Sequence, residues 1–211
     1  MFITRHDTIF ERLNHGIIKW GDHVTLVFGG SFNPPTRAHL EVIVTLRRRF
    51  PDSDVILLPV PDDYRKKGLV PLEDRKRMLE ILTEGLEGVR VSTLEARTGY
   101  KGTRAALDML SKRHNDVRFV IGADQLRTLM TWIDAEALLA SYPFIVMARK
   151  GGMDASEATQ AFSGVPHDLT FIPFDSPFSS TMAREDLTSR EDVLTDGVRH
   201  YIKTHRLYEE N

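Results

Sequence analysis

A threonine and a histidine follow closely on a glycine turn in the first third of the chain. Gly29 and Gly30 end an apolar run, and Thr36 and His39 lie just beyond two prolines. Glycines have no Cβ, so a phosphate can approach the backbone, and the amides of such a turn bind anions. The spacing of Thr36 and His39 places hydroxyl and imidazole on one face of a helix that should begin near Thr36. These residue types predict a phosphate clamp that contains no enzyme nucleophile.

A second candidate phosphate site lies near the other end of the chain. Ser179, Ser180 and Thr181 precede an amphipathic run, which is the usual pattern of a helix N-cap. Amides at a capped helix start, together with the positive end of the helix dipole, favour anions. Arg184 follows one turn later and can add a bidentate contact to a phosphate. The alternatives are a cap without a ligand and a solvated surface arginine.

The rest of the chain reads as alternating strands and helices. Apolar β-prone runs lie at 24–28, 55–59, 89–92, 118–121, 144–147 and 169–172. Helical patterns lie at 36–49, 71–84, 102–114, 135–140, 154–162, 181–189 and 196–205. This alternation predicts an α/β fold, a Rossmann-like, doubly wound and mainly parallel sheet with helices on both faces.

Three further polar candidates follow the later apolar runs. Gly122 and Asp124 come after the fourth run, and Arg149 comes after the fifth. Ligands of such sheets bind beyond the carboxyl ends of the strands, where the strand order reverses, so these residues should share a rim with the glycine turn. The Asp124 carboxylate can accept hydrogen bonds from ribose hydroxyls; its alternative role is to cap the helix that follows.

Length and composition narrow the class of protein. The 211 residues suit one domain, which we place at 24–211. The formal net charge of -2 gives no global basic field, so we expect no nucleic-acid partner. The absence of cysteine excludes disulfides, thiolate metal sites and a cysteine nucleophile. No run reaches transmembrane length, so we expect no membrane contact and a cytoplasmic location.

The first residues, 1–23, form an N-terminal extension. The segment mixes charged and apolar residues and so lacks the uninterrupted apolar core of a signal peptide. Phe10, Leu13, Ile17 and Trp20 recur at helical spacing, which predicts a short amphipathic helix packed on the domain.

Both phosphate motifs resemble signatures of the nucleotidyltransferase superfamily. The turn at 30–34 with Thr36-x-x-His39 is similar to its first signature, and the run at 178–184 is similar to its second. Two other segments, 119–139 and 201–208, resemble bacterial nicotinate-nucleotide adenylyltransferases, a branch of that superfamily. The resemblance covers residues 24 to 208.

The resemblance implies a role for each matching residue. His39, Thr36 and Arg184 take the catalytic positions, with His39 donating to the α-phosphate of ATP. The ATP-binding set is Gly29, Gly30, Ser31, Phe32, His39, Gly122, Asp124, Arg149, Ser179, Ser180, Thr181 and Arg184. The mononucleotide-binding set is Asn33, Lys66, Lys67, Thr103 and Trp132. Trp132 would stack on the pyridine ring or, alternatively, anchor the core.

This chain departs from the pattern of the family at three places. Thr36 replaces a histidine that is common in the nicotinate-nucleotide branch, and a threonine can donate to a phosphate but carries no titratable charge. Ala105 and Ala106 stand where the family has an aspartate and a threonine. Either Lys66 or Lys67 could serve as the family's lysine. These departures bear mainly on the identity of the acceptor.

The reaction implied is adenylyl transfer from ATP to nicotinate mononucleotide, with Mg²⁺ entering with the ATP and no metal site of the protein's own. Alternatives are nicotinamide mononucleotide or another phosphorylated acceptor, and a nucleotide-binding relative without activity. A NAD-binding oxidoreductase is excluded, because no Gly-x-Gly-x-x-Gly follows the first strand. A homo-oligomer is compatible with the sequence, which does not determine the oligomeric state.

Overall fold

Six strands form one parallel sheet at the centre of the protein. The computed structural model describes residues 23–64, 66–185 and 191–209, so the helix expected within the N-terminal extension lies outside the described residues. The strand order is β3-β2-β1-β4-β5-β6, and each neighbouring pair is parallel. The strands are β1 (Thr25–Gly30), β2 (Asp54–Pro59), β3 (Val89–Val91), β4 (Val117–Gly122), β5 (Phe144–Ala148) and β6 (Leu169–Pro173). The predicted doubly wound α/β fold is confirmed.

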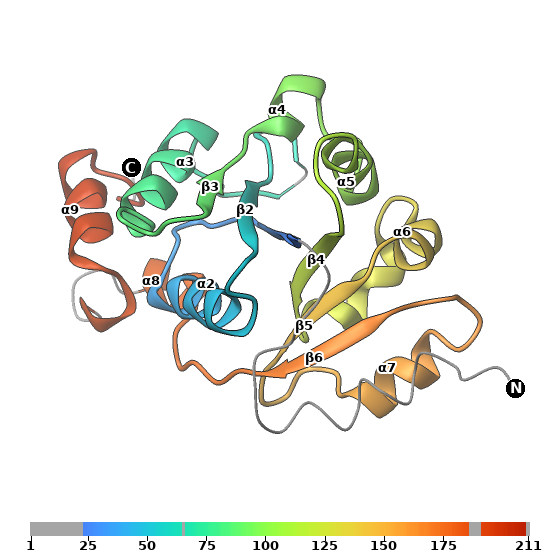
Figure 1. The fold of residues 1–211 in the computed structure, drawn as a ribbon. Coiled ribbons are helices and arrows are strands. Elements are labelled where there is room, and N and C mark those ends of the chain that lie inside the picture. Colours follow the sequence, from blue (N-terminus) through green and yellow to red (C-terminus); the bar gives the residue numbers. More distant parts are fainter. Residues whose placement is uncertain (1–22, 65, 186–190, 210–211) are drawn as a thin grey trace, which may run out of the picture.

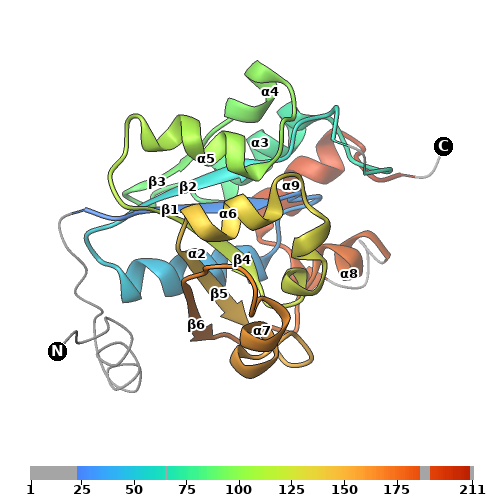
Figure 2. The same ribbon diagram turned by 90° about the vertical axis from the view of Figure 1, so that its right-hand side faces the viewer.

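Helices cover both faces of this sheet. They are α2 (Arg37–Arg49), α3 (Leu72–Leu82), α4 (Leu94–Thr98), α5 (Thr103–Ser111), α6 (Ala135–Ser141), α7 (Ala155–Ala161), α8 (Ser180–Glu185) and α9 (Asp196–Thr204), with 3₁₀ helices η1 (Gln125–Thr131) and η2 (Glu191–Val193). Figure 1 shows α2, α3 and α9 on one side of the sheet and α5, α6 and α7 on the other. Figure 2 shows α2 and α5 on opposite sides of β1.

The apolar runs become central strands because both of their faces are buried. Successive residues of β1 point to opposite faces of the sheet: Leu26 joins the core under α2, α3 and α9, and Val27 joins the core under α5 and α6. Both side chains are fully buried. Near-continuous apolar runs are therefore required here, in place of alternating polar and apolar residues.

The switch point of the sheet lies between β1 and β4. β1 pairs with β2 on one side, where Gly30 is opposite Pro59, and with β4 on the other. Connections leave the two halves of the sheet in opposite directions at this point, which opens a crevice beyond the carboxyl ends of the strands. The glycine turn and Gly122 both lie there.

Short elements were not predicted. α4 has five residues and η1 is a 3₁₀ helix, so neither shows the 3.6-residue period that reveals an amphipathic helix. The helix predicted at 181–189 is seen as α8, which ends at Glu185 before residues that are not described. None of the described helices is long and apolar enough to cross a membrane.

Candidate active site

The glycine turn ends β1 and is packed against two aromatic rings. A Cβ on Gly29 would lie 2.9 Å from the ring of Phe119, and one on Gly30 would lie 3.2 Å from the ring of Phe32. Phe32 itself has a positive φ of 47°. The turn thus needs small residues for its own packing as well as for the approach of a ligand.

Thr36 and His39 are joined by hydrogen bonds at the start of α2. Thr36 is the N-cap residue, and its backbone N–H donates to Nδ1 of His39 over 2.9 Å. Its hydroxyl oxygen also lies 2.9 Å from the same nitrogen. Because an amide can only donate, Nδ1 must be the acceptor, and the proton of a neutral ring is on Nε2. The sequence placed both side chains on one helix face but did not reveal that one fixes the tautomer of the other.

The imidazole of His39 is neutral at physiological pH. Burial, together with the positive charge of Arg149, lowers the pKa of His39 to about 4. The ring of Phe32 packs against it with 5.1 Å between centroids. His39 is therefore held as an oriented Nε2–H donor and not as a general base.

The serines of the second motif join α8 to the segment before α2. The Oγ of Ser179 accepts from the backbone N–H of Met182 at 3.2 Å, as an N-cap does. The hydroxyl of Ser180 donates to the carbonyl of Pro34 at 2.8 Å. The two phosphate motifs, distant in sequence, are thus in direct contact.

Arg184 strengthens that contact. Its Nη1 donates to the carbonyl of Asn33 at 2.6 Å, and its Nη2 lies 3.4 Å from Oγ1 of Thr181. Arg184 also lines the cavity between the two motifs. It therefore both holds the two motifs together and brings a positive charge to the space between them.

That cavity has a volume of about 220 Å³ and is lined by both motifs. Every residue predicted to bind ATP lines it, and so do Thr36, Asn33 and Lys66 from the other predicted sets. The cations on its wall are Lys66, Arg149 and Arg184, against one carboxylate, Asp124, among the described lining residues. This charge balance suits a polyanion. Asp124 precedes η1 without a side-chain capping bond, so the alternative role as a cap is not observed.

A second cavity of about 70 Å³ adjoins the first and shares Gly29, Gly30 and Ser31 with it. Thr103 and Trp132, both predicted to bind the mononucleotide, line it. The indole of Trp132 is half-buried and packs edge-on to Phe119, so it serves the core and the cavity at once. Sequence reasoning missed four polar residues of the lining, namely Tyr64, Tyr100, Glu95 and Gln125, and Gln125 also lines the larger cavity.

Neither cavity includes Lys67 among its lining residues. Lys66, by contrast, lines the larger cavity and donates from Nζ to Oγ of Ser31 at 3.1 Å. Burial and the positive charges of Arg184 and Arg75 lower its pKa. The structure therefore favours Lys66 over Lys67 as the lysine that contacts the ligand, a choice that the sequence did not decide.

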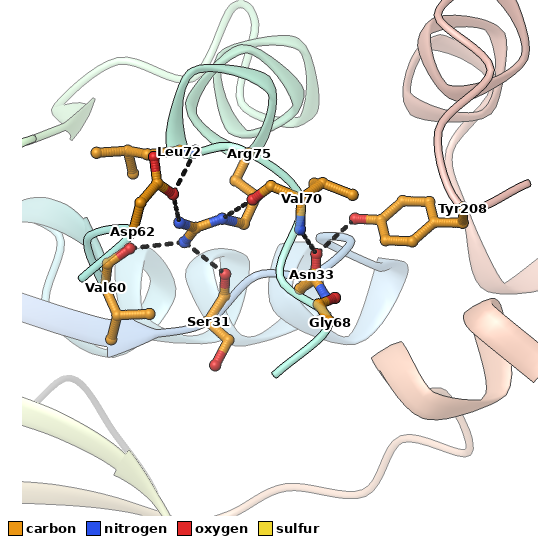
Figure 3. A network of polar contacts seen from close by, with 9 residues as sticks. All are labelled: Ser31, Asn33, Val60, Asp62, Gly68, Val70, Leu72, Arg75 and Tyr208. Carbon is orange, nitrogen blue, oxygen red and sulfur yellow. Dashed lines mark hydrogen bonds and ion pairs between the residues drawn. The ribbon is translucent and has the colours of Figure 1, made fainter. Parts of the chain in front are cut away.

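A buried arginine, Arg75, is hydrogen-bonded to Ser31 just after the glycine turn, as Figure 3 shows. Arg75 on α3 is fully buried. Its Nε donates to the carbonyl of Val70 at 2.8 Å, and its Nη1 donates to the carbonyls of Val60 at 2.7 Å and Ser31 at 3.2 Å. Its Nη2 pairs with Asp62 at 2.9 Å. Arg75 thereby fixes the loop that carries Lys66 against the turn, a role for which the sequence offered no motif.

The side chain of Asn33 belongs to the same framework (Figure 3). Its Nδ2 donates to the carbonyl of Gly68 at 2.8 Å, and its Oδ1 accepts from the N–H of Val70 at 3.1 Å. The same oxygen accepts from the hydroxyl of Tyr208 at 2.9 Å. Asn33 was predicted to contact the mononucleotide; in the structure its amide joins a loop and the C-terminal tail to the turn.

Comparisons with known proteins agree with this geometry. The family model described as cytidylyltransferase-like matches residues 27–186. A probable nicotinate-nucleotide adenylyltransferase of Acholeplasma laidlawii is 35% identical over 188 residues, which cover 89% of this chain and 98% of that protein. One of Listeria innocua is 30% identical, covering 88% and 97%. The solved Plasmodium falciparum nicotinic acid mononucleotide adenylyltransferase in complex with NaAD shares the fold, with a TM-score of 0.75, 22% identity and coverage of 90% and 98%.

Proposed function

The chain belongs to the nicotinate-nucleotide adenylyltransferase family, and from that premise we propose that it transfers the adenylyl group of ATP to nicotinate mononucleotide, giving deamido-NAD and pyrophosphate. One observation carries the proposal. The larger cavity, between the two phosphate motifs, has an excess of positive charge on its wall and adjoins the smaller, aromatic-lined cavity at the glycine turn. If the triphosphate of ATP occupies the larger cavity and the ring of the mononucleotide occupies the smaller one, the phosphates of the two substrates meet at that turn.

The proposed chemistry needs positioning and charge stabilisation only. An oxygen of the mononucleotide 5′-phosphate attacks the α-phosphorus of ATP, the bond from that phosphorus to the bridging oxygen breaks, and pyrophosphate leaves with the electron pair. The Nε2–H of His39 donates to the α-phosphate as charge develops on it, and Arg184 and Lys66 offset the charge of the triphosphate. Holding two anions in line supplies much of the remaining acceleration.

The described lining fits Mg²⁺ that is bound mainly through the phosphates. The described residues contain no group of three or more histidines or carboxylates that could hold a metal ion. Asp124 is the carboxylate that the wall of the larger cavity offers. When bound, Mg²⁺ would neutralise phosphate charge, while waters and phosphate oxygens complete its coordination, as is usual for this ion.

We extend the proposal to the organisation of the chain. Residues 24–211 would form the catalytic domain, with 1–23 as an extension, in a cytoplasmic enzyme. The family match at 27–186 and the buried core residues, which run from Val24 to Ile202, support these limits of the domain.

An acceptor assay tests the function. The full chain is incubated with ATP and Mg²⁺ and with nicotinate mononucleotide, nicotinamide mononucleotide, phosphopantetheine or a flavin mononucleotide in turn, and pyrophosphate release and the dinucleotide are measured. We expect the fastest release with nicotinate mononucleotide and loss of activity when EDTA removes the metal. ATP binding without pyrophosphate release from any acceptor would instead identify a nucleotide-binding protein without catalysis.

The two neighbouring lysines provide a matched pair of variants. Lys66→Met should lower kcat/KM for ATP by about 10- to 100-fold, the usual worth of a hydrogen bond to a charged group. Lys67→Met should leave it within about twofold, because Lys67 lines neither cavity. Steady-state kinetics on both variants measures the difference. Equal losses, or a larger loss in Lys67→Met, would contradict the assignment of Lys66.

A further inference from the structure

A carboxyl group that the reaction does not use is enclosed in the smaller cavity. Glu95 lies on α4, is 5% exposed and lines the same cavity as Trp132 and Thr103. Among the described residues its carboxyl group has no hydrogen-bond or ion-pair partner, and its oxygens are not among the fully buried unpaired atoms, so the carboxyl is open to the cavity. Burial of such a group without a partner is costly when it is charged. A buried, unpartnered carboxyl on the wall of a ligand cavity therefore needs a functional explanation.

The groups around Glu95 are acidic or neutral. Asp63, from the loop after β2, accepts from the backbone N–H of Tyr100 at 3.1 Å and acts on Glu95 as a like charge. Burial and the charge of Asp63 raise the pKa of Glu95 to about 7. Burial, with the charges of Glu95 and Tyr64, raises the pKa of Tyr100 to about 12, so the phenol of Tyr100 stays neutral near pH 7. The described residues that line this cavity include no lysine or arginine.

The lining of the cavity suits a flat ring with one polar substituent. Aromatic side chains of Tyr64, Tyr100, Phe119 and Trp132 contribute to its wall. The rings of Tyr64 and Tyr100 meet edge to face at 4.8 Å between centroids. A cationic pyridine ring is well suited to such walls, and the polar group on the ring then has to be recognised by the few polar side chains among them.

The two pyridine mononucleotides present opposite requirements to a carboxyl group. The carboxylate of nicotinate can only accept hydrogen bonds, and the amide of nicotinamide can donate as well. A protonated glutamic acid donates one hydrogen bond, whereas an ionised one only accepts and repels another carboxylate. No lysine or arginine of the described wall offsets this repulsion.

We propose that Glu95 reads the ring substituent of the acceptor: protonated, it donates a hydrogen bond to the carboxylate of nicotinate mononucleotide, and ionised, it disfavours that acceptor relative to nicotinamide mononucleotide. This inference rests on the proposed adenylyl transfer to a pyridine mononucleotide. Glu95 is protonated below its pKa and loses its proton as pH rises through about 7, so selectivity for nicotinate is present at pH 6 and declines toward pH 8.

The experiment compares kcat/KM for the two mononucleotides at pH 6 and pH 8. We expect the nicotinate-to-nicotinamide ratio of the wild-type protein to fall by about tenfold, because the protonated fraction of a group falls about tenfold per pH unit above its pKa. The ratio cancels effects common to both acceptors, including ionisation of the 5′-phosphate and of ATP. His39, with a pKa of about 4, does not titrate in this range.

Two variants isolate the carboxyl group. Glu95→Gln has an N–H donor and no titration, so its ratio should be the same at both pH values. Glu136→Gln, on the exposed surface of α6, is the matched control and should keep the wild-type fall. Asp63→Asn removes the like charge and can still accept from Tyr100, so it should shift the fall to lower pH. This last variant tests the inference even if Glu95→Gln does not fold.

The outcomes distinguish a failure of the role of Glu95 from a failure of the proposed function. A wild-type ratio that does not change with pH, or a Glu95→Gln variant that retains the wild-type fall, would overturn the role of Glu95 while leaving adenylyl transfer intact. A wild-type protein that uses neither mononucleotide at either pH would overturn the proposed function, and the inference with it.

Discussion

His39→Asn should lower kcat by about 10²- to 10³-fold, because it removes one oriented donor to the transferring phosphate. The variant should still fold, and its KM for ATP should change by only a few-fold. The asparagine oxygen can still accept from Thr36, which now bonds to Nδ1, so the start of α2 is preserved. What the substitution removes is the Nε2–H. Steady-state kinetics and circular dichroism measure the two halves of this prediction.

Two further variants serve as controls for the histidine. His39→Gln places an amide N–H near the position of Nε2 and should recover part of the lost kcat. His200→Asn, on the exposed face of α9, changes the same residue type away from both cavities and should have wild-type kinetics. If His39→Asn keeps kcat within a few-fold of wild type, His39 does not stabilise the transition state.

Arg75→Met should lower the free energy of unfolding by about 2 to 4 kcal/mol. The substitution removes the donors to the carbonyls of Val60, Val70 and Ser31, and each buried acceptor left without a partner costs about 1–3 kcal/mol, in part relieved by water. The ion pair adds little, since the Asp62 side chain is 61% exposed. Urea unfolding followed by circular dichroism measures the change.

A neighbouring arginine on the same helix controls for helix propensity and charge. Arg77→Met breaks an exposed pair with Glu80 and should cost less than about 1 kcal/mol. We also expect Arg75→Met, assayed where it is folded, to raise the KM for ATP, because Arg75 fixes the loop that carries Lys66. Equal stability losses in the two variants would show that the buried bonds of Arg75 have no special weight.

Most of the fold could be predicted because its signals are local and repeated. The four inner strands, β1, β2, β4 and β5, are short apolar runs that are buried on both faces, and each long helix has an amphipathic period. The start of α2 was predicted at Thr36, because Pro34 and Pro35 restrict φ and precede the cap. The elements that were missed, α4, η1 and η2, are short, and they depend on the core residues against which they pack.

Part of the candidate site was likewise predictable from the sequence, and part was not. The residues predicted to bind ATP all line one cavity, since they lie at or just after the end of a strand, in the first turn of α2, or in and next to the short helix α8, and parallel topology brings these segments together. Arg75 and Glu95 were missed because their significance depends on burial, and a buried arginine has the same sequence appearance as a surface one.

Thr36 and His39 show which properties depend on the sequence alone and which depend on the tertiary structure. By itself the sequence determined the parallel α/β fold, the two phosphate motifs and the branch of the superfamily, because these depend on residue type and spacing along the chain. Only the tertiary structure decided that Thr36 fixes the tautomer of His39, that Lys66 and not Lys67 reaches the larger cavity, and that Glu95 is enclosed without a partner. The physical reason is that protonation, tautomer and hydrogen-bond partners depend on desolvation and on neighbours that are remote in the chain.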